Sequence, residues 1–233
     1  MENNFVEGEI VLIDKPINWT SFNVVKKVSI LIKKKYHLKD LKVGHAGTLD
    51  PLATGLLVIC TGKNTKKIST LQDSNKEYIA TIEFGKTTPS FDLETEFDKE
   101  YPVKHVTKEL IKEKLKDFLG EIEQVPPIYS AKYINGRRAY KIARKGTEIV
   151  LKPNKVFISE LEILDFKNPI LTIRILCSKG TYIRSFARDI GLSLNSGAYL
   201  KALKRTISGD YKIKDALSIE EFQEKLFSLQ PEI

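Results

Sequence analysis

The chain has 233 residues, of which 42% are hydrophobic and 29% are charged, the composition of an ordinary globular protein with enough length for a substantial core. Lys and Arg number 38 against 30 Asp and Glu, which gives a formal net charge of +8. This excess favours a polyanionic partner, with nucleic acid as the leading candidate, although a generically basic protein would show the same balance.

Cysteine and histidine usage argues against a disulfide framework and against a zinc enzyme. Cys60 and Cys177 each lie inside an apolar run, and the three histidines are scattered along the chain. Residues 62–66, GKNTK, do not satisfy the phosphate-loop pattern. The first seven residues lack the features of a secretory signal, and no apolar run approaches the ~20 residues that span a bilayer. We therefore expect a cytoplasmic protein without a bound metal.

The N-terminal part of the chain predicts a strand followed by a helix. Residues 10–13 read IVLI and precede Asp-Lys-Pro, which is typical of a short strand that ends in a turn. Ser21 is the expected N-cap of a helix that runs to Lys35, because apolar residues recur at close to helical spacing. These apolar residues are Phe22, Val25, Val28 and Ile32.

Residues 43–55, VGHAGTLDPLATG, are the most informative segment of the chain. Its three glycines permit left-handed or close-approach backbone, and Pro51 directs Asp50 toward an extended conformation. The segment leads into the apolar run 56–60, a predicted buried strand that would anchor the loop. A lone carboxylate in such a loop indicates a functional site, although Asp50 could instead only cap a turn.

The middle of the chain predicts a strand and a helix joined by an irregular segment. Residues 76–85 alternate between apolar and polar side chains, which is typical of a half-exposed strand. Residues 86–103 read as an irregular, acidic connection. The amphipathic pattern over 107–119 predicts a helix that stops at Gly120.

The C-terminal part predicts a second junction of a strand, a loop and a helix. Residues 170–177 form an apolar strand that leads through a glycine turn into a helical segment over 181–194. Ser218 and Glu221 form a capping box that opens a last helix. Because strands and helices mix without a regular βαβ alternation, we predict an α+β fold with a mixed, mainly antiparallel sheet flanked by helices.

Residues 124–146, QVPPIYSAKYINGRRAYKIARKG, form a basic arm with six Lys or Arg and no acidic residue. Three tyrosines lie among these cations, which places rings that stack on bases beside charges that bind phosphates. The Asn135-Gly136 turn predicts a protruding hairpin or a loop and helix, and a plain solvated face is the alternative. Arg137, Lys141 and Lys145 recur at helical spacing. The candidate RNA-binding residues of the arm are Lys132, Arg137, Arg138, Lys141 and Arg144.

Asp50 needs a cationic partner if it is to stay ionised in a buried site, since desolvation alone raises the pKa of a carboxylate. Arg184 is the expected partner because it follows an apolar strand and a glycine turn. Arg188 or Lys66 could take its place. A carboxylate kept charged in this way can act as a nucleophile toward an electrophilic carbon of a sugar or a base.

The run GHAGTLDPLATGLLVICTGKNTK, residues 44–66, resembles the catalytic-loop signature of the TruB family of tRNA pseudouridine synthases. The resemblance continues in residues 76–78, 125–131 and 177–184, in the family's order. Together with Asp-Lys-Pro near the start, these segments cover almost the whole chain. The resemblance implies the pseudouridine synthase fold, with one catalytic domain over 1–233 that includes an RNA-gripping insertion over 124–152.

The activity that this resemblance implies is the isomerisation of uridine at position 55, in the T arm of tRNA, to pseudouridine, without a cofactor or a metal. Asp50 would attack either C6 of the uracil or C1′ of the ribose, and the detached ring would rotate and rejoin through C5. The target base has to be flipped out of a folded loop, and Tyr78 would stack on it. Arg184 would pair with Asp50, and His45 would fill or hydrogen-bond in the space that the base leaves.

Further residues match the family with weaker claims. Lys66 and Leu203 match positions that line its pocket, and the basic arm matches the insertion that grips the T arm. Residues 87–92, TTPSFD, depart from the usual run, in which an acid follows the second threonine, and Asp92 falls where a later acid that contacts RNA is expected. We expect a catalytic domain up to Ile233 without the separate C-terminal RNA-binding domain that many members carry. We expect a monomer that binds tRNA and no membrane.

Two other functions stay open at this level. An RNA-binding or tRNA-folding protein would have the same charge and aromatic content. A glycosidic-bond hydrolase would result if water intercepted an intermediate at C1′, and it would release free uracil. Replacement of Asp50 and a search for free uracil separate these functions from an isomerase.

Overall fold

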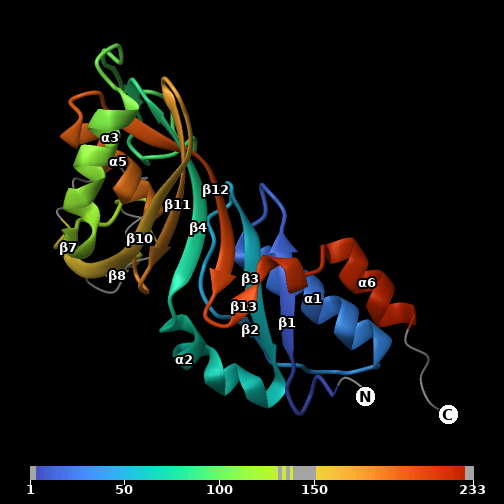
Figure 1. Cartoon of the computed structure of the whole chain (residues 1–233). Helices are drawn as coiled ribbons and strands as arrows, with labels where there is room; N and C mark the ends of the chain where they lie inside the picture. Colours follow the sequence, from blue (N-terminus) through green and yellow to red (C-terminus); the bar gives the residue numbers. More distant parts are fainter. Residues whose placement is uncertain (1–3, 131–132, 135–136, 139–150, 229–233) are drawn as a thin grey trace. The chain divides into compact units, whose positions relative to one another are not determined.

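The structure, a computed structural model, describes residues 4–130, 133–134, 137–138 and 151–228 (Figure 1). The chain forms two compact units, unit 1 from Met1–Tyr78 with Lys204–Ile233, and unit 2 from Ile79–Leu203. The boundaries between the units fall inside two strands, β4 (Lys76–Phe84) and β12 (Ala198–Ser208). The prediction that residues 1–233 make one catalytic domain stays a prediction.

Unit 1 contains a sheet that is organised around strand β3 (Ala53–Thr61). β3 pairs antiparallel with β1 (Ile10–Lys15) along the length of β1, and with β2 (Val43–His45) near its own end. In the strand order β3 is followed by β12, whose end pairs with β13 (Tyr211–Lys212). The strands predicted at 10–13 and 56–60 are confirmed, and both are longer than predicted.

Strand β3 is buried on both of its faces. Leu57 and Ile59 belong to a core cluster with β1, α1 (Ser21–Lys35) and α6 (Ile219–Ser228). Leu56 and Val58 belong to a second cluster, because successive residues of a strand point to opposite faces. This double burial explains why the sequence of β3 is continuously apolar. The other helical segments of unit 1 are η1 (Gly62–Lys67), α2 (Ile68–Gln72) and η3 (Ile213–Asp215).

Helix α1 has the predicted limits, but its N-cap is Thr20 and not Ser21. The Thr20 hydroxyl accepts a hydrogen bond from the Asn23 amide at 3.0 Å. The Ser21 hydroxyl is instead held by the backbone of Leu49, donating to its carbonyl at 3.0 Å and accepting from its amide at 2.8 Å. Phe22, which the helical spacing placed on the buried face, is 70% exposed.

The sheet of unit 2 has the strand order β4, β11 (Ile170–Cys177), β10 (Asn154–Lys167) and β7 (Gly120–Gln124). β10 pairs antiparallel with both β11 and β7. The predicted strand at 170–177 is confirmed. One face of β11 is buried, as expected for a period of two residues, and its members are Leu171, Ile173, Ile175 and Cys177.

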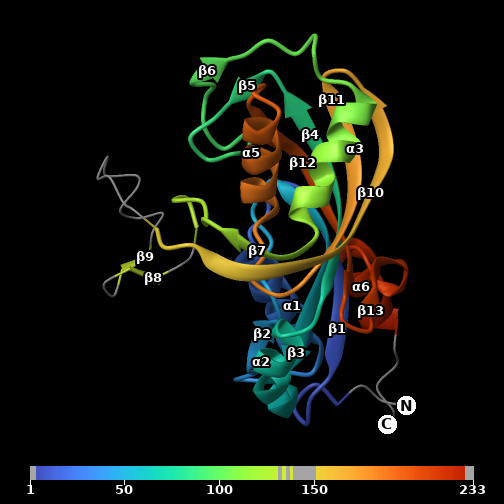
Figure 2. The same ribbon diagram turned by 60° about the vertical axis from the view of Figure 1, so that its left-hand side comes forward.

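Helices α3 (Lys108–Leu115) and α5 (Ile183–Ser193) lie side by side against this sheet (Figures 1 and 2). The predicted helix over 107–119 consists of α3 and a 3-10 turn, η2 (Lys116–Phe118), and it stops where Gly120 takes a φ of +86°. The rings of Phe118 and Phe186 meet edge to face at 5.3 Å, which fixes η2 on α5.

Shorter elements complete the described part of the fold. The segment predicted to be irregular over 86–103 contains a small antiparallel pair, β5 (Lys86–Thr87) with β6 (Lys99–Glu100). The predicted capping box is confirmed, since the Ser218 amide donates to the Glu221 carboxylate at 2.7 Å and the Glu221 amide to the Ser218 hydroxyl at 3.0 Å.

The α+β class is confirmed. The strand pairs β1–β3, β10–β11 and β10–β7 are antiparallel, and helices pack on the sheet. Two isolated parallel bridges, Ile13 with Leu217 and Asp92 with Leu200, make the pairing mixed. Among the described residues, no helix is both long and apolar enough to cross a lipid bilayer.

Candidate active site

Asp50 lies half-buried in the loop that joins β2 to β3 in unit 1. Gly47 in this loop and Gly55 near the start of β3 have left-handed backbone, with φ of +118° and +100°. The Asp50 carbonyl accepts from the Ala53 amide at 3.1 Å, which closes a tight turn around Pro51. Leu49, the residue before Asp50, is fixed by both hydrogen bonds of the Ser21 hydroxyl. The loop is therefore rigidly attached to the core on both sides of its carboxylate.

Lys15, the last residue of β1, is fully buried beside this loop. Its Nζ donates to the carbonyls of Pro16 at 2.9 Å, Trp19 at 2.5 Å and Pro51 at 3.4 Å. Burial lowers the pKa of Lys15 from 10.5 to about 8, and the negative charge of Asp50 acts in the opposite direction. The two side chains are thus coupled electrostatically.

A second buried cation, Arg205 on β12, reaches the same loop and is 1% exposed. Its Nε donates to the Leu56 carbonyl at 2.7 Å and its Nη2 to the Gly47 carbonyl at 3.0 Å. Neither Arg205 nor Lys15 is predicted from the sequence as a site residue. The sequence signal that could have pointed to Lys15 is its position in Asp-Lys-Pro, at the end of strand β1.

His45 is the last residue of β2 and is half-buried. Its Nδ1 is one of the buried side-chain atoms that have no hydrogen-bond partner within the described part of the chain. Burial lowers the pKa of His45 below 6.5, and the charge of Arg205 lowers it further, whereas a bond to the Gly47 backbone raises it. His45 is therefore a neutral imidazole at neutral pH.

The predicted site residues Tyr78, Lys66 and Leu203 lie on three different elements. Tyr78 is buried on β4 with 9% of its surface exposed, and Lys66 is exposed in η1. Leu203 is half-buried on β12, in unit 2. Their roles around a flipped base stay predictions.

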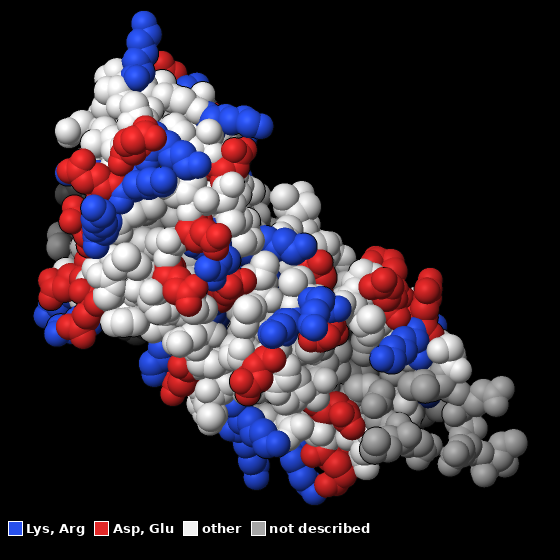
Figure 3. Space-filling view, in the orientation of Figure 1, with Lys and Arg blue, Asp and Glu red and all other residues white. Residues whose placement is uncertain are grey.

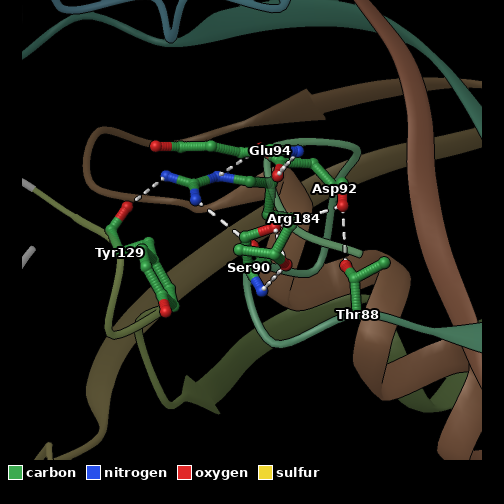
Figure 4. Close-up of polar contacts among 7 residues, drawn as sticks. Thr88, Ser90, Asp92, Glu94, Tyr129 and Arg184 are labelled. Carbon is green, nitrogen blue, oxygen red and sulfur yellow. Dashed lines mark hydrogen bonds and ion pairs between the residues drawn. The ribbon is translucent and has the colours of Figure 1, made fainter. Parts of the chain in front are cut away.

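In unit 2, Arg184 is held at the start of α5 by a ring of polar groups (Figure 4). Its Nη2 donates to the Tyr129 carbonyl at 2.9 Å and its Nη1 to the Ser90 carbonyl at 3.3 Å. The Arg184 Nε lies 3.6 Å from the Asp92 Oδ2, and both side chains are buried. These contacts fix the guanidinium and provide it with a carboxylate partner.

Asp92 is itself held by neighbouring residues of the segment 88–94. Its other carboxylate oxygen accepts from the Glu94 amide at 2.9 Å, and its carbonyl accepts from the hydroxyls of Thr88 at 2.6 Å and Ser90 at 3.1 Å. The structure thus gives Asp92 a partner in Arg184, which sequence analysis did not foresee. The pairing of Arg184 with Asp50 and an RNA contact of Asp92 both stay predictions.

The start of the basic arm is fastened to α5. The Val125 carbonyl accepts from the Ser185 hydroxyl at 2.7 Å and from Arg188 Nη2 at 3.2 Å. Arg188 also contacts the Asp189 carboxylate at 2.7 Å and stacks over the ring of Phe91 at 4.7 Å. Arg188 is therefore engaged within unit 2.

The described part of the arm supports the hairpin alternative. Tyr133–Ile134 (β8) pairs antiparallel with Arg137–Arg138 (β9), so the helical spacing proposed to begin at Arg137 is wrong there. Lys132, Lys141 and Arg144 lie outside the described residues. On the face shown in Figure 3, Lys and Arg alternate with Asp and Glu, so the net positive charge is not gathered on that face.

The described groups of unit 1 place a carboxylate, Asp50, in electrostatic contact with the buried cation Lys15. No three His, Cys, Asp or Glu side chains of the described ranges gather in a way that could hold a metal ion. Asp50 can act as a nucleophile, and Tyr78 offers a ring for stacking.

Comparison with known proteins assigns the family. A model described as the N-terminal domain of TruB family pseudouridylate synthases matches residues 33–183, more than half of the chain. The chain belongs to the TruB family of pseudouridylate synthases. This membership makes it a pseudouridine synthase and confirms the resemblance seen in the sequence.

Relatives within the TruB family match nearly end to end. The tRNA pseudouridine synthase B of Phocaeicola vulgatus is 55% identical over 223 residues, which cover 96% of this chain and 95% of the relative. The protein of the same name from Parabacteroides distasonis is 51% identical over 96% of this chain and 95% of its own length. The tRNA pseudouridine synthase B of Flavobacterium johnsoniae is 52% identical, and the match covers 95% of this chain and 97% of the relative.

Solved structures of larger relatives share the TruB fold. A chain of a Cbf5-Nop10-Gar1 complex is 28% identical with a TM-score of 0.71, and the match covers 94% of this chain and 54% of that one. A chain of an H/ACA RNP bound to a substrate RNA containing 2′-deoxyuridine is 25% identical with a TM-score of 0.68, over 97% of this chain and 57% of that one. This chain spans about half the length of these solved relatives.

Proposed function

We propose that this chain converts the uridine at position 55, in the T arm of tRNA, to pseudouridine, with Asp50 as the nucleophile. The observation that carries the proposal is the rigid loop that holds the Asp50 carboxylate beside the buried cation Lys15, inside the sequence that resembles the family's catalytic signature. The tRNA substrate is supported by the names of relatives that are 51% to 55% identical over nearly the whole chain.

The reaction needs a nucleophile that attacks and then leaves. The N1–C1′ bond breaks and a C5–C1′ bond forms, while N1 gains a proton and the hydrogen on C5 is lost to solvent. An ionised Asp50 would add to C6 of the uracil or to C1′ of the ribose and would be released when the new bond is complete. The substrate and the product have the same atoms, so no oxidant or reductant takes part.

Other residues would then prepare the base for attack. Tyr78 would stack on the flipped uracil, and Arg184 would complete the charge balance of Asp50 while Asp92 holds its guanidinium. His45, neutral and with its Nδ1 unpaired, would hydrogen-bond or fill space in the RNA loop. Lys66 and Leu203 would line the pocket.

The basic arm would contact the phosphates of the T arm. Its density of Lys and Arg without acidic residues supports this role, since cations that neutralise phosphates dominate the affinity for RNA. Lys132, Arg137, Arg138, Lys141 and Arg144 are the residues proposed for it. We include in the proposal a monomeric enzyme that acts in the cytoplasm, where its relatives' substrate is made.

The test maps the product on an unmodified tRNA transcript. Carbodiimide labelling followed by primer extension should give a stop at position 55 with the wild type and none with Asp50→Asn, while both proteins bind the tRNA. A transcript with cytidine at position 55 is the matched substrate control. No stop with the wild type despite tRNA binding would contradict the proposal and favour an RNA-binding protein, and free uracil in the reaction would indicate a hydrolase.

A further inference from the structure

The loop that carries Asp50 is held from behind by one buried side chain, Arg205. A single guanidinium bonds to Gly47, three residues before Asp50, and to Leu56, six residues after it, at 3.0 Å and 2.7 Å. These bonds join parts of the chain that are 158 and 149 residues apart in sequence. Arg205 thus connects the two arms of the loop through a strand that does not belong to it.

Gly55, near the start of β3, leaves the space that the backbone of Arg205 occupies. A Cβ on Gly55 would lie 2.3 Å from the Arg205 carbonyl oxygen and 2.7 Å from its amide nitrogen. A Cβ on Gly47 would lie 3.4 Å from Arg205 Nη1. Since real Cβ atoms do not approach backbone to 2.3 Å, the close packing of Gly55 against β12 requires glycine. The loop and Arg205 therefore fit together as one rigid unit.

Arg205 is also a buried charge that meets no carboxylate directly. The structure gives it no ion pair within the part of the chain that is described, and its bonds go to two carbonyls. The positive charge of Arg205 disfavours the protonated form of Lys15, whereas the negative charge of Asp50 favours it. Lys15 and Arg205 are therefore two buried cations of unit 1 that act on the same region as the carboxylate of Asp50.

We propose that Arg205 is a positioning residue that holds the Asp50 loop in the geometry for attack by bonding to both of its arms, although it does not itself touch the RNA. The inference rests on the function proposed above. At 1% exposure the side chain has no surface to offer to a substrate, so its loss should change the chemical step and not the binding of tRNA. A misplacement of a catalytic group by about 1 Å can cost about 100-fold in rate.

The experiment compares Arg205→Met, which removes both bonds and the charge, with Arg205→Lys, which keeps the charge but cannot bridge both carbonyls. We measure the single-turnover rate of pseudouridine formation and the dissociation constant for tRNA. Lys204→Met is the matched control, since it removes a half-exposed cation from the neighbouring position of the same strand.

The expected result is a rate loss of about 100-fold for Arg205→Met and about 10-fold for Arg205→Lys, with tRNA affinity within twofold of the wild type and no rate change for Lys204→Met. If Arg205→Met does not fold, Arg205→Lys decides alone. A rate within threefold of the wild type in the folded variant, or an equal loss of tRNA affinity, would overturn the inference. An inactive wild type would instead overturn the proposed function.

Discussion

Replacement of Asp92 by Asn tests the electrostatic partner that the structure gives to Arg184. Asparagine has nearly the same shape, and it keeps the oxygen that accepts from the Glu94 amide at 2.9 Å. The substitution therefore removes the negative charge that faces Arg184 and little else. Arg184 keeps its bonds to the carbonyls of Tyr129 and Ser90.

The magnitude follows from distance and burial. The Arg184 and Asp92 side chains are 5% and 6% exposed and lie 3.6 Å apart. At an effective dielectric constant of about 20, two unit charges at this distance attract with roughly 4 to 5 kcal/mol before desolvation is counted. Breaking one side of a buried pair typically costs about 3 to 5 kcal/mol. Because two carbonyls still hold Arg184, we expect a loss of about 3 kcal/mol in the free energy of unfolding.

The assay is urea denaturation followed by circular dichroism, with the fluorescence of Trp19 as a separate report on unit 1. Glu121→Gln is the control, since it breaks an exposed ion pair of the same unit, between Glu121 and Lys155 at 2.9 Å, and should leave unfolding unchanged. A loss below about 1 kcal/mol for Asp92→Asn would refute the reasoning, because a solvated pair would then be the better description.

Three further predictions concern the loop, its histidine and the basic arm. Gly55→Ala should lower the free energy of unfolding by roughly 3 kcal/mol, because its Cβ would lie 2.3 Å from the Arg205 carbonyl oxygen. The control is Gly180→Ala, where a Cβ would meet nothing within 4 Å, and it should cost only about 1 kcal/mol in thermal or urea denaturation. Equal losses for the two variants would contradict the packing argument. Because the pKa of His45 is lowered in the folded protein, the unfolded chain binds a proton more readily below about pH 6.5, and the free energy of unfolding falls as the pH falls. His45→Asn should therefore lose less stability than the wild type between about pH 7.5 and 5.5. Identical stability profiles of the two proteins against pH would contradict this prediction. Replacing Arg137 and Arg138 by Gln should reduce the slope of log tRNA affinity against log salt concentration by roughly one unit for each phosphate contact that is lost. An unchanged slope would show that these two residues do not contact the phosphates of the tRNA.

Local signals in the sequence were enough to predict the loop and most elements. The glycines and proline around Asp50, the apolar run of β3 and the capping box at Ser218 each act within a few residues, and the structure contains all three. The choice of Thr20 over Ser21 as the N-cap was not predictable in the same way. Both hydroxyls suit a cap, and the contact of Ser21 with Leu49, 28 residues away, decides between them.

The supports of the site could not be predicted because they connect distant parts of the chain. Arg205 reaches the loop from 149 residues away, and Arg184 binds the Ser90 carbonyl from 94 residues away. A buried cation is recognised only when burial and partners are known, since the same side chain in a sequence reads as a surface charge. Lys15 is the clearest case, because it stands beside a turn and yet is fully buried.

The function proposed above requires that Asp50 carries out uridine isomerisation on tRNA. The most direct measurement is the release of tritium from a tRNA transcript labelled at C5 of its uridines, because the new C5–C1′ bond displaces the hydrogen there. We expect one equivalent of tritium per tRNA with the wild type and none with Asp50→Asn, at tRNA concentrations where both proteins are fully bound. Release that is unaffected by Asp50→Asn would contradict the role of Asp50 as the nucleophile, and no release with the wild type would contradict the isomerase function.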